Sequence, residues 1–394
     1  MNATAQDAST RGNRDVFPRP NHDEMARQRY AMGLRQYLFG PLRESVGKAF
    51  KSSIAPGYEA REGRPLTDLA VARRELLGLP SYQFFCDLHR VSQDMIWNSV
   101  IDTLDRAGPE LKAAYHRLAG QARGSLDLHP DLPVPDYLEI VDIHCMPGSY
   151  QRSTGDDDLV AGALYDRGGY LYSPGSGPER GGLGHTSLNF LRQAYPDFSP
   201  RRILDMGCGV GGPTAVHAEA FPQAELHAID IGAALLRYGH LRAESMGRVI
   251  HFSQQDAEHT SYPDGSFDLV MSHIMFHETA AHAVPRILAE CRRLLAPGGV
   301  MLHLELPPLD RLPDTYTRII FDGDSWYNNE PFWMREHDLD WPAMLRAAGF
   351  APEHIQIKLT PVQVQAPPSA GDTKPRWVNG PFALTAFTAT VPAR

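Results

Sequence analysis

Residues 204 to 215 hold the densest group of ligand-binding side chains and turn residues in this sequence. The segment reads LDMGCGVGGPTA, in which Gly207, Gly209 and Gly212 form a G-x-G-x-x-G pattern. Glycines in this pattern let a strand turn sharply into a helix and let the backbone approach an adenosine-containing ligand. The glycines alone do not identify that ligand, because a dinucleotide and other adenosyl compounds would use the same turn.

Asp205, two residues before the first glycine, distinguishes between these ligands. A dinucleotide would place a pyrophosphate over the turn, where a carboxylate would repel it. S-adenosylmethionine presents a sulfonium and an ammonium instead. At about 5 Å and an effective dielectric near 20, one such attraction is on the order of 3 kcal/mol before desolvation. The sign of the charge therefore favours a cationic adenosyl donor.

A second group of polar side chains lies in SHIMFHETAAH, residues 272 to 282. His277 or Glu278 would be able to remove a proton from a hydroxyl or an amine, and local hydrogen bonding is the alternative role. His273 and His277 have a spacing that suits a metal on a helix, but the H-E-x-x-H arrangement is incomplete. His144 and Cys145 are too few ligands for a metal, so we predict loop packing there and no metal site.

The elements that must position these side chains follow Ser187. Strand and helix patterns alternate from there to the end, which predicts a parallel sheet covered by helices on both faces. The expected strands number seven, and the last two pair as an antiparallel edge. They are RRILDMG, AELHAID, VIHFSQQD, FDLVMSH, GVMLHLEL, HIQIKLT and FALTAFTATV.

The N-terminal part has a different composition. Residues 1–23 are polar and are expected to be disordered or loosely draped. Residues 24–140 show apolar side chains at helical spacing, which predicts a helical domain. Turns between its helices are expected where glycine and proline occur, at Gly40-Pro41, Pro56-Gly57, Leu79-Pro80 and Gly108-Pro109.

Two segments are candidates for enclosing a ligand. Residues 141–186 are rich in Tyr, Gly and Pro and indicate a linker or a lid, with ordinary surface anchoring of the tyrosines as the alternative. Residues 307–340 form an insertion after the fifth strand of the alternating region. Trp326, Tyr327 and Trp333 in it would make an apolar wall for a substrate, although aromatic residues more often belong to a core.

Composition limits the partners. Lys and Arg number 38 against 47 Asp and Glu, and the formal charge is −9. Without a dense basic run, binding to nucleic acid or to an anionic membrane surface is not expected. The four widely spaced cysteines fit a reducing compartment, and no run of eighteen apolar residues occurs. We therefore expect a cytoplasmic protein with a small-molecule partner, and a homodimer is left open.

The sequence resembles a known family at several points in order. ILDMGCGVG is similar to motif I of the class I S-adenosylmethionine-dependent methyltransferases, which have an acidic residue two before the glycines. Asp230 ends the second strand, where the family binds the ribose hydroxyls, and Asp256-Ala257 stand where the family reads the adenine amino group. LLAPGGVMLHLEL matches the following helix, turn and strand. The resemblance covers roughly residues 185 to 394, the last 90 only in strand pattern.

This resemblance implies a Rossmann-like seven-stranded α/β sheet with an antiparallel last strand, and S-adenosyl-L-methionine as cofactor. It implies methyl transfer to O, N or C of a small, partly apolar molecule of secondary or lipid-quinone metabolism. The alternatives are an NAD-dependent oxidoreductase with the same glycine loop and a non-methylating S-adenosylmethionine-binding protein. The expected cofactor-binding residues are Asp205, Gly207, Cys208, Gly209, Gly211, Asp230, Ile231, Asp256, Ala257, His273, Tyr165 and Tyr172.

Overall fold

The computed structural model describes residues 16–172, 181–337, 339–366 and 376–393 of the chain. Most of the segment expected to be disordered, residues 1–15, lies outside the described residues. Val16 and Phe17 are buried, at 2% and 5% exposure, so the described end of that segment is held against the protein. None of the described helices is long and apolar enough to cross a lipid bilayer.

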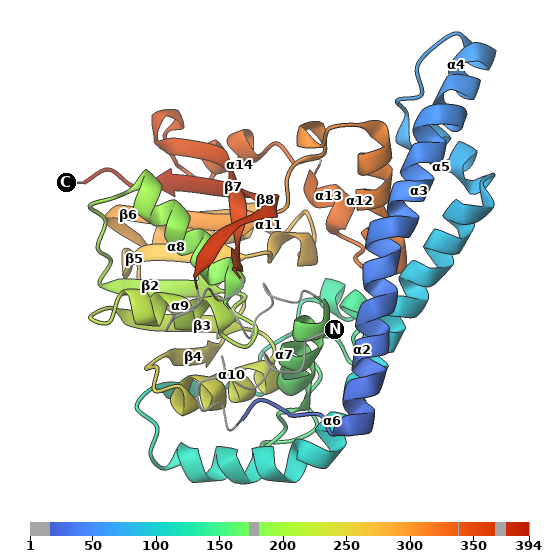
Figure 1. Cartoon of the computed structure of the whole chain (residues 1–394). Helices are drawn as coiled ribbons and strands as arrows, with labels where there is room; N and C mark the ends of the chain where they lie inside the picture. The colour runs from blue at the N-terminus through green and yellow to red at the C-terminus, as the bar shows by residue number, and fades with distance from the viewer. Residues whose placement is uncertain (1–15, 173–180, 338, 367–375, 394) are drawn as a thin grey trace.

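An eight-stranded sheet forms the centre of the described structure, with the strand order β1-β4-β3-β2-β5-β6-β8-β7 (Figure 1). All seven expected strands are present, and β8 is antiparallel to both of its neighbours, as predicted. The additional strand, β1, comes from the N-terminal part and pairs in parallel with β4. The strands are β1 (Ser125–Asp127), β2 (Arg202–Met206), β3 (Glu225–Asp230), β4 (His251–Gln254), β5 (Phe267–His273), β6 (Leu295–Glu305), β7 (Ile355–Gln365) and β8 (Trp377–Thr390).

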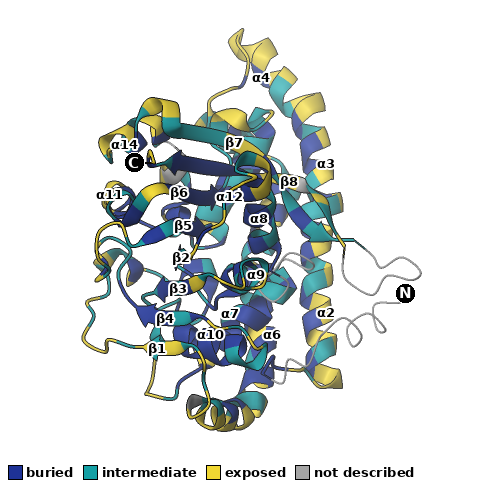
Figure 2. Ribbon diagram, turned by 90° about the vertical axis from the view of Figure 1, so that its left-hand side faces the viewer, coloured by how far each residue is buried: buried dark blue, intermediate teal, exposed yellow. Residues whose placement is uncertain are grey.

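Helices cover both faces of this sheet, because the side chains of each strand alternate between two apolar cores. In β2, Ile203 faces a core that includes Phe190 and Leu236, whereas the next residue, Leu204, faces a core that includes Ile287 and Trp341. The central strands β2 and β5 are accordingly almost wholly buried, whereas the edge strand β7 is mostly half-buried (Figure 2). The covering helices are α8 (Gly182–Ala194), α9 (Gly212–Ala220), α10 (Ala233–Ser245), α11 (Val284–Leu294) and α14 (Trp341–Ala347).

The N-terminal helical region differs from the prediction in how its helices are joined. Of the four expected turns, the one at Leu79-Pro80 separates α5 from α6. Two others lie inside helical structure that runs from His22 to Glu62, and the fourth lies inside α6. Pro41 occupies a π-helical turn and Pro56 the first turn of α4, where a missing N–H is tolerated. The elements are α2 (His22–Tyr37), η1 (Leu38–Leu42), α3 (Arg43–Ala49), η2 (Phe50–Ile54), α4 (Ala55–Glu62), α5 (Leu69–Leu77) and α6 (Pro80–Ala119).

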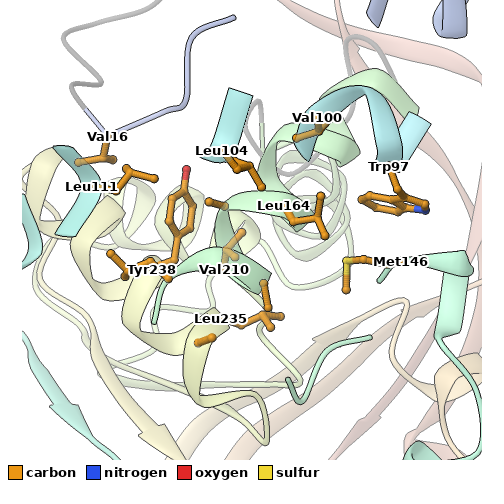
Figure 3. Packing of buried hydrophobic residues seen from close by; sticks show 14 of the residues in the cluster. Val16, Trp97, Val100, Leu104, Leu111, Met146, Leu164, Val210, Leu235 and Tyr238 are labelled. Carbon is orange, nitrogen blue, oxygen red and sulfur yellow. The ribbon is translucent and has the colours of Figure 1, made fainter. Parts of the chain in front are cut away.

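Within residues 141–186, where the composition indicates a linker or a lid, the structure places a buried helix, α7 (Val160–Tyr172). It packs between α6 and α10, and Figure 3 shows Leu164 of α7 among Trp97, Val100 and Tyr238. The fit is close, because a Cβ added at Gly168 would lie 2.0 Å from the Trp97 ring. Helix α7 is therefore part of a core shared by the N-terminal helices and the sheet region.

The insertion after β6 packs against the N-terminal helices. Ile319 and Ile320 of α12 (Thr315–Tyr327) share an apolar core with Leu76 of α5 and Phe85 of α6. Figure 1 shows α12 and α13 beside the long helices. The remaining described elements are η3 (Asp136–Leu138), η4 (Ile143–Cys145), η6 (Phe276–Glu278), η7 (Leu309–Arg311), α13 (Trp333–His337) and η8 (Pro352–His354).

Candidate active site

A cleft with an open volume of about 840 Å³ lies at the carboxyl ends of β2, β3 and β5. Parallel sheets bind ligands at the carboxyl ends of their strands. The site lies where the connections from two neighbouring strands leave toward opposite faces of the sheet. The structure brings eight of the twelve expected cofactor-binding residues into this cleft: Gly207, Gly209, Asp230, Ile231, Asp256, Ala257, His273 and Tyr165.

The glycine loop after β2 has the backbone shape that requires glycine. Gly207 and Gly209 have φ angles of +63° and +54°. A Cβ at position 207 would lie 2.6 Å from the sulfur of Met275. Asp230 fixes this loop from β3, because its Oδ2 accepts a hydrogen bond from the Gly209 N–H at 2.8 Å and its Oδ1 one from the Gly232 N–H at 2.9 Å. Burial raises the pKa of Asp230.

Asp205, expected to attract the cofactor, is buried and does not line the cleft. Its Oδ2 accepts a hydrogen bond from the Thr214 hydroxyl at 2.6 Å, and its Oδ1 is 3.4 Å from Nδ1 of His273. The residue is 1% exposed and lines a second cavity of about 430 Å³, together with Cys208 and both glycines of the turn. Both oxygens are therefore already engaged, and the carboxylate reaches only this smaller cavity.

Carboxylates dominate the charge of the cleft, and His144, which is paired with Glu278, is its one described basic lining residue with a raised pKa. Asp230, Asp256 and Glu278 line the cleft, and none of its described lining residues is a lysine or an arginine. Asp256 keeps one oxygen for a ligand, because only its Oδ1 is bonded, to the Glu258 N–H at 2.8 Å. Such a lining attracts a cationic ligand and repels a diphosphate.

Glu278 and His144 meet at the other end of the cleft. Nε2 of His144 is 2.8 Å from Oε1 of Glu278, and its Nδ1 is 3.0 Å from Oε1 of Glu330. The Tyr150 hydroxyl donates to the same Glu278 oxygen at 3.0 Å. Glu278 Oε2 is buried and has no hydrogen-bond partner, so one carboxylate oxygen remains for a bound molecule.

His277 extends this arrangement away from the cleft. Its Nδ1 is 2.8 Å from Oε2 of Glu305 and its Nε2 is 3.6 Å from Oε1 of Glu278. Acidic and basic groups thus alternate in one buried chain. We call Glu305, His277, Glu278, His144 and Glu330 the charge chain.

The pKa values in the charge chain follow from burial and from the neighbouring charges. Burial lowers the pKa of the His277 imidazole, but the charge and hydrogen bond of Glu305 together with the charges of Glu278 and Glu330 outweigh burial and raise it to about 10. His144 behaves in the same way, because Glu278 and Glu330 together raise its pKa well above the usual value. Burial raises the pKa of Glu278, but His144, His277 and Tyr150 together outweigh burial and lower that pKa. Burial raises the pKa of Glu330 to about 7.

The same groups are close enough for a metal ion, because His144, Glu278 and Glu330 offer ligand atoms within 4.8 Å of one another. Each ring nitrogen of His144 already faces a carboxylate. That pairing describes an imidazolium held between two anions, and a metal ligand must be a neutral imidazole. The described geometry therefore fits a charge network better than a metal centre.

Several expected site residues lie elsewhere. Gly211 packs against Phe252, and the hydroxyl of Tyr172 accepts a hydrogen bond from Asn328 at 3.3 Å. His277 does not line the cleft and reaches it through Glu278.

The three aromatic residues expected as a substrate wall also lie outside the cleft. Trp326 is 63% exposed and stacks under Arg73, Tyr327 packs on His89, and the Trp333 ring is 5.1 Å from that of His277. The reason is that α12 packs on α5 and α6 rather than over the sheet edge.

The sequence analysis missed the segment from 135 to 150, which supplies His144, Tyr150 and Tyr137 to the cleft. His144 has a left-handed backbone, with φ of +58°, a conformation that is strained for a residue with a side chain. Helix α6 holds this turn, since Trp97 Nε1 and Gln93 Nε2 both donate to the His144 carbonyl, at 2.6 and 3.0 Å. The only available signal was the His-Cys pair that we assigned to loop packing.

Comparison with known proteins agrees with this geometry. The family model described as "Methyltransferase domain" matches residues 203–299. These residues contain the glycine loop, Asp230, Asp256 and the charge-chain residues His277 and Glu278. Residues 203–299 form a methyltransferase domain of the class I S-adenosylmethionine-dependent type.

Relatives and solved structures are similar over parts of the chain. Demethylmenaquinone methyltransferase of Thermus thermophilus is 36% identical over 110 residues, which are 28% of this chain and 49% of that protein. Fatty-acid O-methyltransferase of Mycolicibacterium smegmatis is 29% identical over 171 residues, 41% of this chain and 58% of that one. The chain thus spans about half the length of the curated relatives it matches. A putative methyltransferase structure from Bacillus halodurans is 18% identical with a TM-score of 0.39, covering 52% of this chain and 99% of that one.

Proposed function

We propose that the protein transfers a methyl group from S-adenosylmethionine to an oxygen or nitrogen atom of a small, partly apolar molecule. The observation that carries the proposal is the cleft at the sheet edge. It is lined by three carboxylates and by no described lysine or arginine, its one charged basic group being His144, and Oε2 of one of these carboxylates, Glu278, is buried without a hydrogen-bond partner. An NAD-dependent oxidoreductase would require the same cleft to accept a diphosphate.

The residues around the glycine loop fit the cofactor. Asp230 would accept hydrogen bonds from the two ribose hydroxyls, because its two backbone hydrogen bonds leave further lone pairs free. Ile231 and Ala257 are small apolar neighbours for the adenine, and Asp256 has a carboxylate oxygen for its amino group. Asp205 would attract the amino-acid part from the adjoining cavity. When bound, S-adenosylmethionine supplies a methyl group on a positively charged sulfur.

The acceptor would lie between the glycine loop and the charge chain. Pro135, Leu138, Met275 and Ile287 give this part of the cleft an apolar wall, which excludes water. Its charged end is the pair of Glu278 and His144. This combination suits an apolar molecule that carries a single hydroxyl or amine.

Glu278 would orient that hydroxyl or amine by accepting its hydrogen bond through Oε2. A neutral nucleophile gains positive charge as it takes up a methyl group, and Oε2 of Glu278 would then accept its proton. A fixed carboxylate beside it stabilises this charge without reorganising. His144 and Tyr150 hold Glu278 in place through its other oxygen, Oε1. His277, which is itself paired with Glu305, lies 3.6 Å from the same oxygen. We propose Glu278 as the catalytic residue and His277 as a positioning residue.

The test is formation of S-adenosylhomocysteine from S-adenosylmethionine in the presence of fractionated small-molecule extracts. We expect at least one apolar fraction to stimulate product formation in the parent protein. Firm cofactor binding with no turnover in any fraction would contradict methyl transfer and favour a protein that only binds the cofactor.

Two further features remain proposals. A cytoplasmic location is supported by the four cysteines, all of which are free thiols. A homodimer is a prediction that sedimentation velocity would test.

A further inference from the structure

A further hollow, separate from the cleft and from the cavity beside Asp205, has an open volume of about 1880 Å³. Its sides come from α2, α7, α12, β8 and the residues after β6. We call it the arginine groove, because Arg35, Arg43 and Arg311 line it. The only lining carboxylate among the described residues is Asp324, which lies 3.2 Å from His89.

Much of the arginine groove is apolar. Ile320 and Phe321 of α12 and Leu171 of α7 form its inner side. At its outer side Phe382 and Leu359 are 69% and 53% exposed. Large apolar side chains that gather around a hollow are typical of a binding surface.

Arg35 sits in this apolar setting without an anionic partner. It is 8% exposed, its guanidinium stacks 3.9 Å from the centre of the Tyr172 ring and 4.7 Å from that of Phe39, and Nη1 donates to Gln93 at 2.8 Å. In the part of the chain that the structure describes, neither Arg35 nor Arg43 forms an ion pair with a carboxylate. A buried guanidinium is normally paired, since its charge is costly to remove from water.

We propose that the arginine groove binds a small amphipathic carboxylate, with its anionic end on Arg35 and Arg43 and its apolar chain along Phe321, Leu359 and Phe382. A guanidinium offers two parallel N–H donors that match a carboxylate. The groove concentrates positive charge on a chain whose formal charge is −9, so an anion is attracted to this place in particular. This site is separate from the cleft and does not depend on the proposed methyl transfer.

The side chain of Asn328 links the groove to the cleft. Tyr172 lines the groove, and Asn328 Nδ2 lies 3.3 Å from the Tyr172 hydroxyl and 3.0 Å from Nδ1 of His144, which lines the cleft. A ligand in the groove that contacts Tyr172 is therefore separated from His144 of the charge chain by one side chain, that of Asn328.

The test uses laurate, below its micellar concentration, titrated calorimetrically into the full-length protein with and without S-adenosylhomocysteine. We expect laurate to bind in both states and its neutral methyl ester to bind at least about tenfold more weakly, because the ester lacks the charge. Arg35→Gln and Arg43→Gln should each weaken laurate binding at least about tenfold and leave the S-adenosylhomocysteine affinity unchanged. Arg64→Gln, at an exposed arginine outside the groove, is the matched control and should bind laurate as the parent does.

Arg43 is only half-buried, so its variant keeps the test valid if Arg35→Gln fails to fold. Equal binding of laurate and its methyl ester would overturn the proposal. So would laurate binding that survives both arginine substitutions, or that is lost in Glu278→Gln instead, because the ligand would then lie in the cleft. Affinity for S-adenosylhomocysteine, measured in the same samples, reports separately on the proposed function.

Discussion

At the scale of single residues, we propose that the charge chain gives the cleft its chemistry. Glu278 has one oxygen held by His144 and Tyr150 and one oxygen buried without a partner. The sequence indicated Glu278 from its place after a strand. It did not indicate His144 or Glu330, because they lie 134 and 52 residues away in sequence and meet Glu278 only through the fold.

Replacing Glu278 tests its role directly. Glu278→Gln keeps the shape of the side chain and removes the charge, so we expect kcat to fall about 100-fold, the lower end of what a positioned acid or base contributes. Affinity for S-adenosylhomocysteine should change less than about twofold. Glu139→Gln, at an exposed glutamate in the preceding segment, is the control. A normal kcat in Glu278→Gln would assign the residue to structure alone.

Glu330 gives the reaction a pH dependence. Burial raises its pKa to about 7, so it is neutral below that pH and adds a negative charge to the chain above it. Because extra negative charge stabilises a nucleophile that becomes positive, kcat should rise as the pH increases through about 7. Glu330→Gln should lack this rise. A pH profile that is unchanged in the variant would exclude Glu330 as its source.

Asp230 is the residue on which cofactor affinity should depend most. Asp230→Ala removes a charged acceptor of two ribose hydrogen bonds, and we expect binding of S-adenosylhomocysteine to weaken by about 1 to 3 kcal/mol. Circular dichroism would verify that the sheet is intact. Unchanged affinity in a folded variant would contradict the placement of the ribose.

At the scale of elements, strands were predictable and most helix junctions were not. Each expected strand is present, because buried parallel strands give continuous apolar runs. The glycine and proline pairs in α4 and α6 did not end helices, since tertiary packing overrides local propensity. Helix α7 was missed because glycines normally disfavour helices. Here Gly162 and Gly168 make room for Tyr238 and Trp97.

The fit of α7 against α6 is itself testable. Gly168→Ala would place a Cβ 2.0 Å from the Trp97 ring, so we expect the free energy of unfolding to fall by about 1 to 3 kcal/mol. Gly33→Ala is the control, because Gly33 lies in α2 with no atom near an added Cβ, and it should stabilise the protein by roughly 0.5 to 1 kcal/mol. Urea unfolding measures both. Equal stability of the two variants would mean that α7 is loosely packed.

At the scale of the whole molecule, the N-terminal helices and the sheet region form shared cores. The core in Figure 3 joins Leu104 and Leu111 of α6 to Val210 of the glycine loop and Leu235 of α10. The sequence predicted that the helical region lies over the sheet region but not which side chains of the two regions meet, because apolar periodicity shows that a face is buried and does not show against what. The same contact explains why the α6 side chains Gln93 and Trp97 position His144.

Stability of the whole chain should depend on pH through the charge chain. The pKa of His277 is about 10 in the folded protein and near 6.5 when unfolded. Its stabilising contribution is therefore complete below pH 6.5 and is lost as the pH rises through 10, with a slope of at most about 1.4 kcal/mol per pH unit. Urea unfolding between pH 7 and 10 should show this decline, and His277→Gln should show a shallower one. An equally steep decline in the variant would assign it to other groups.

A negatively lined cleft should select a positively charged adenosyl donor. Calorimetric titration of the parent protein with S-adenosylmethionine, S-adenosylhomocysteine and NADH tests it most directly. The account predicts binding of both adenosyl compounds and none of NADH. Firm binding of NADH with no binding of S-adenosylmethionine would contradict it.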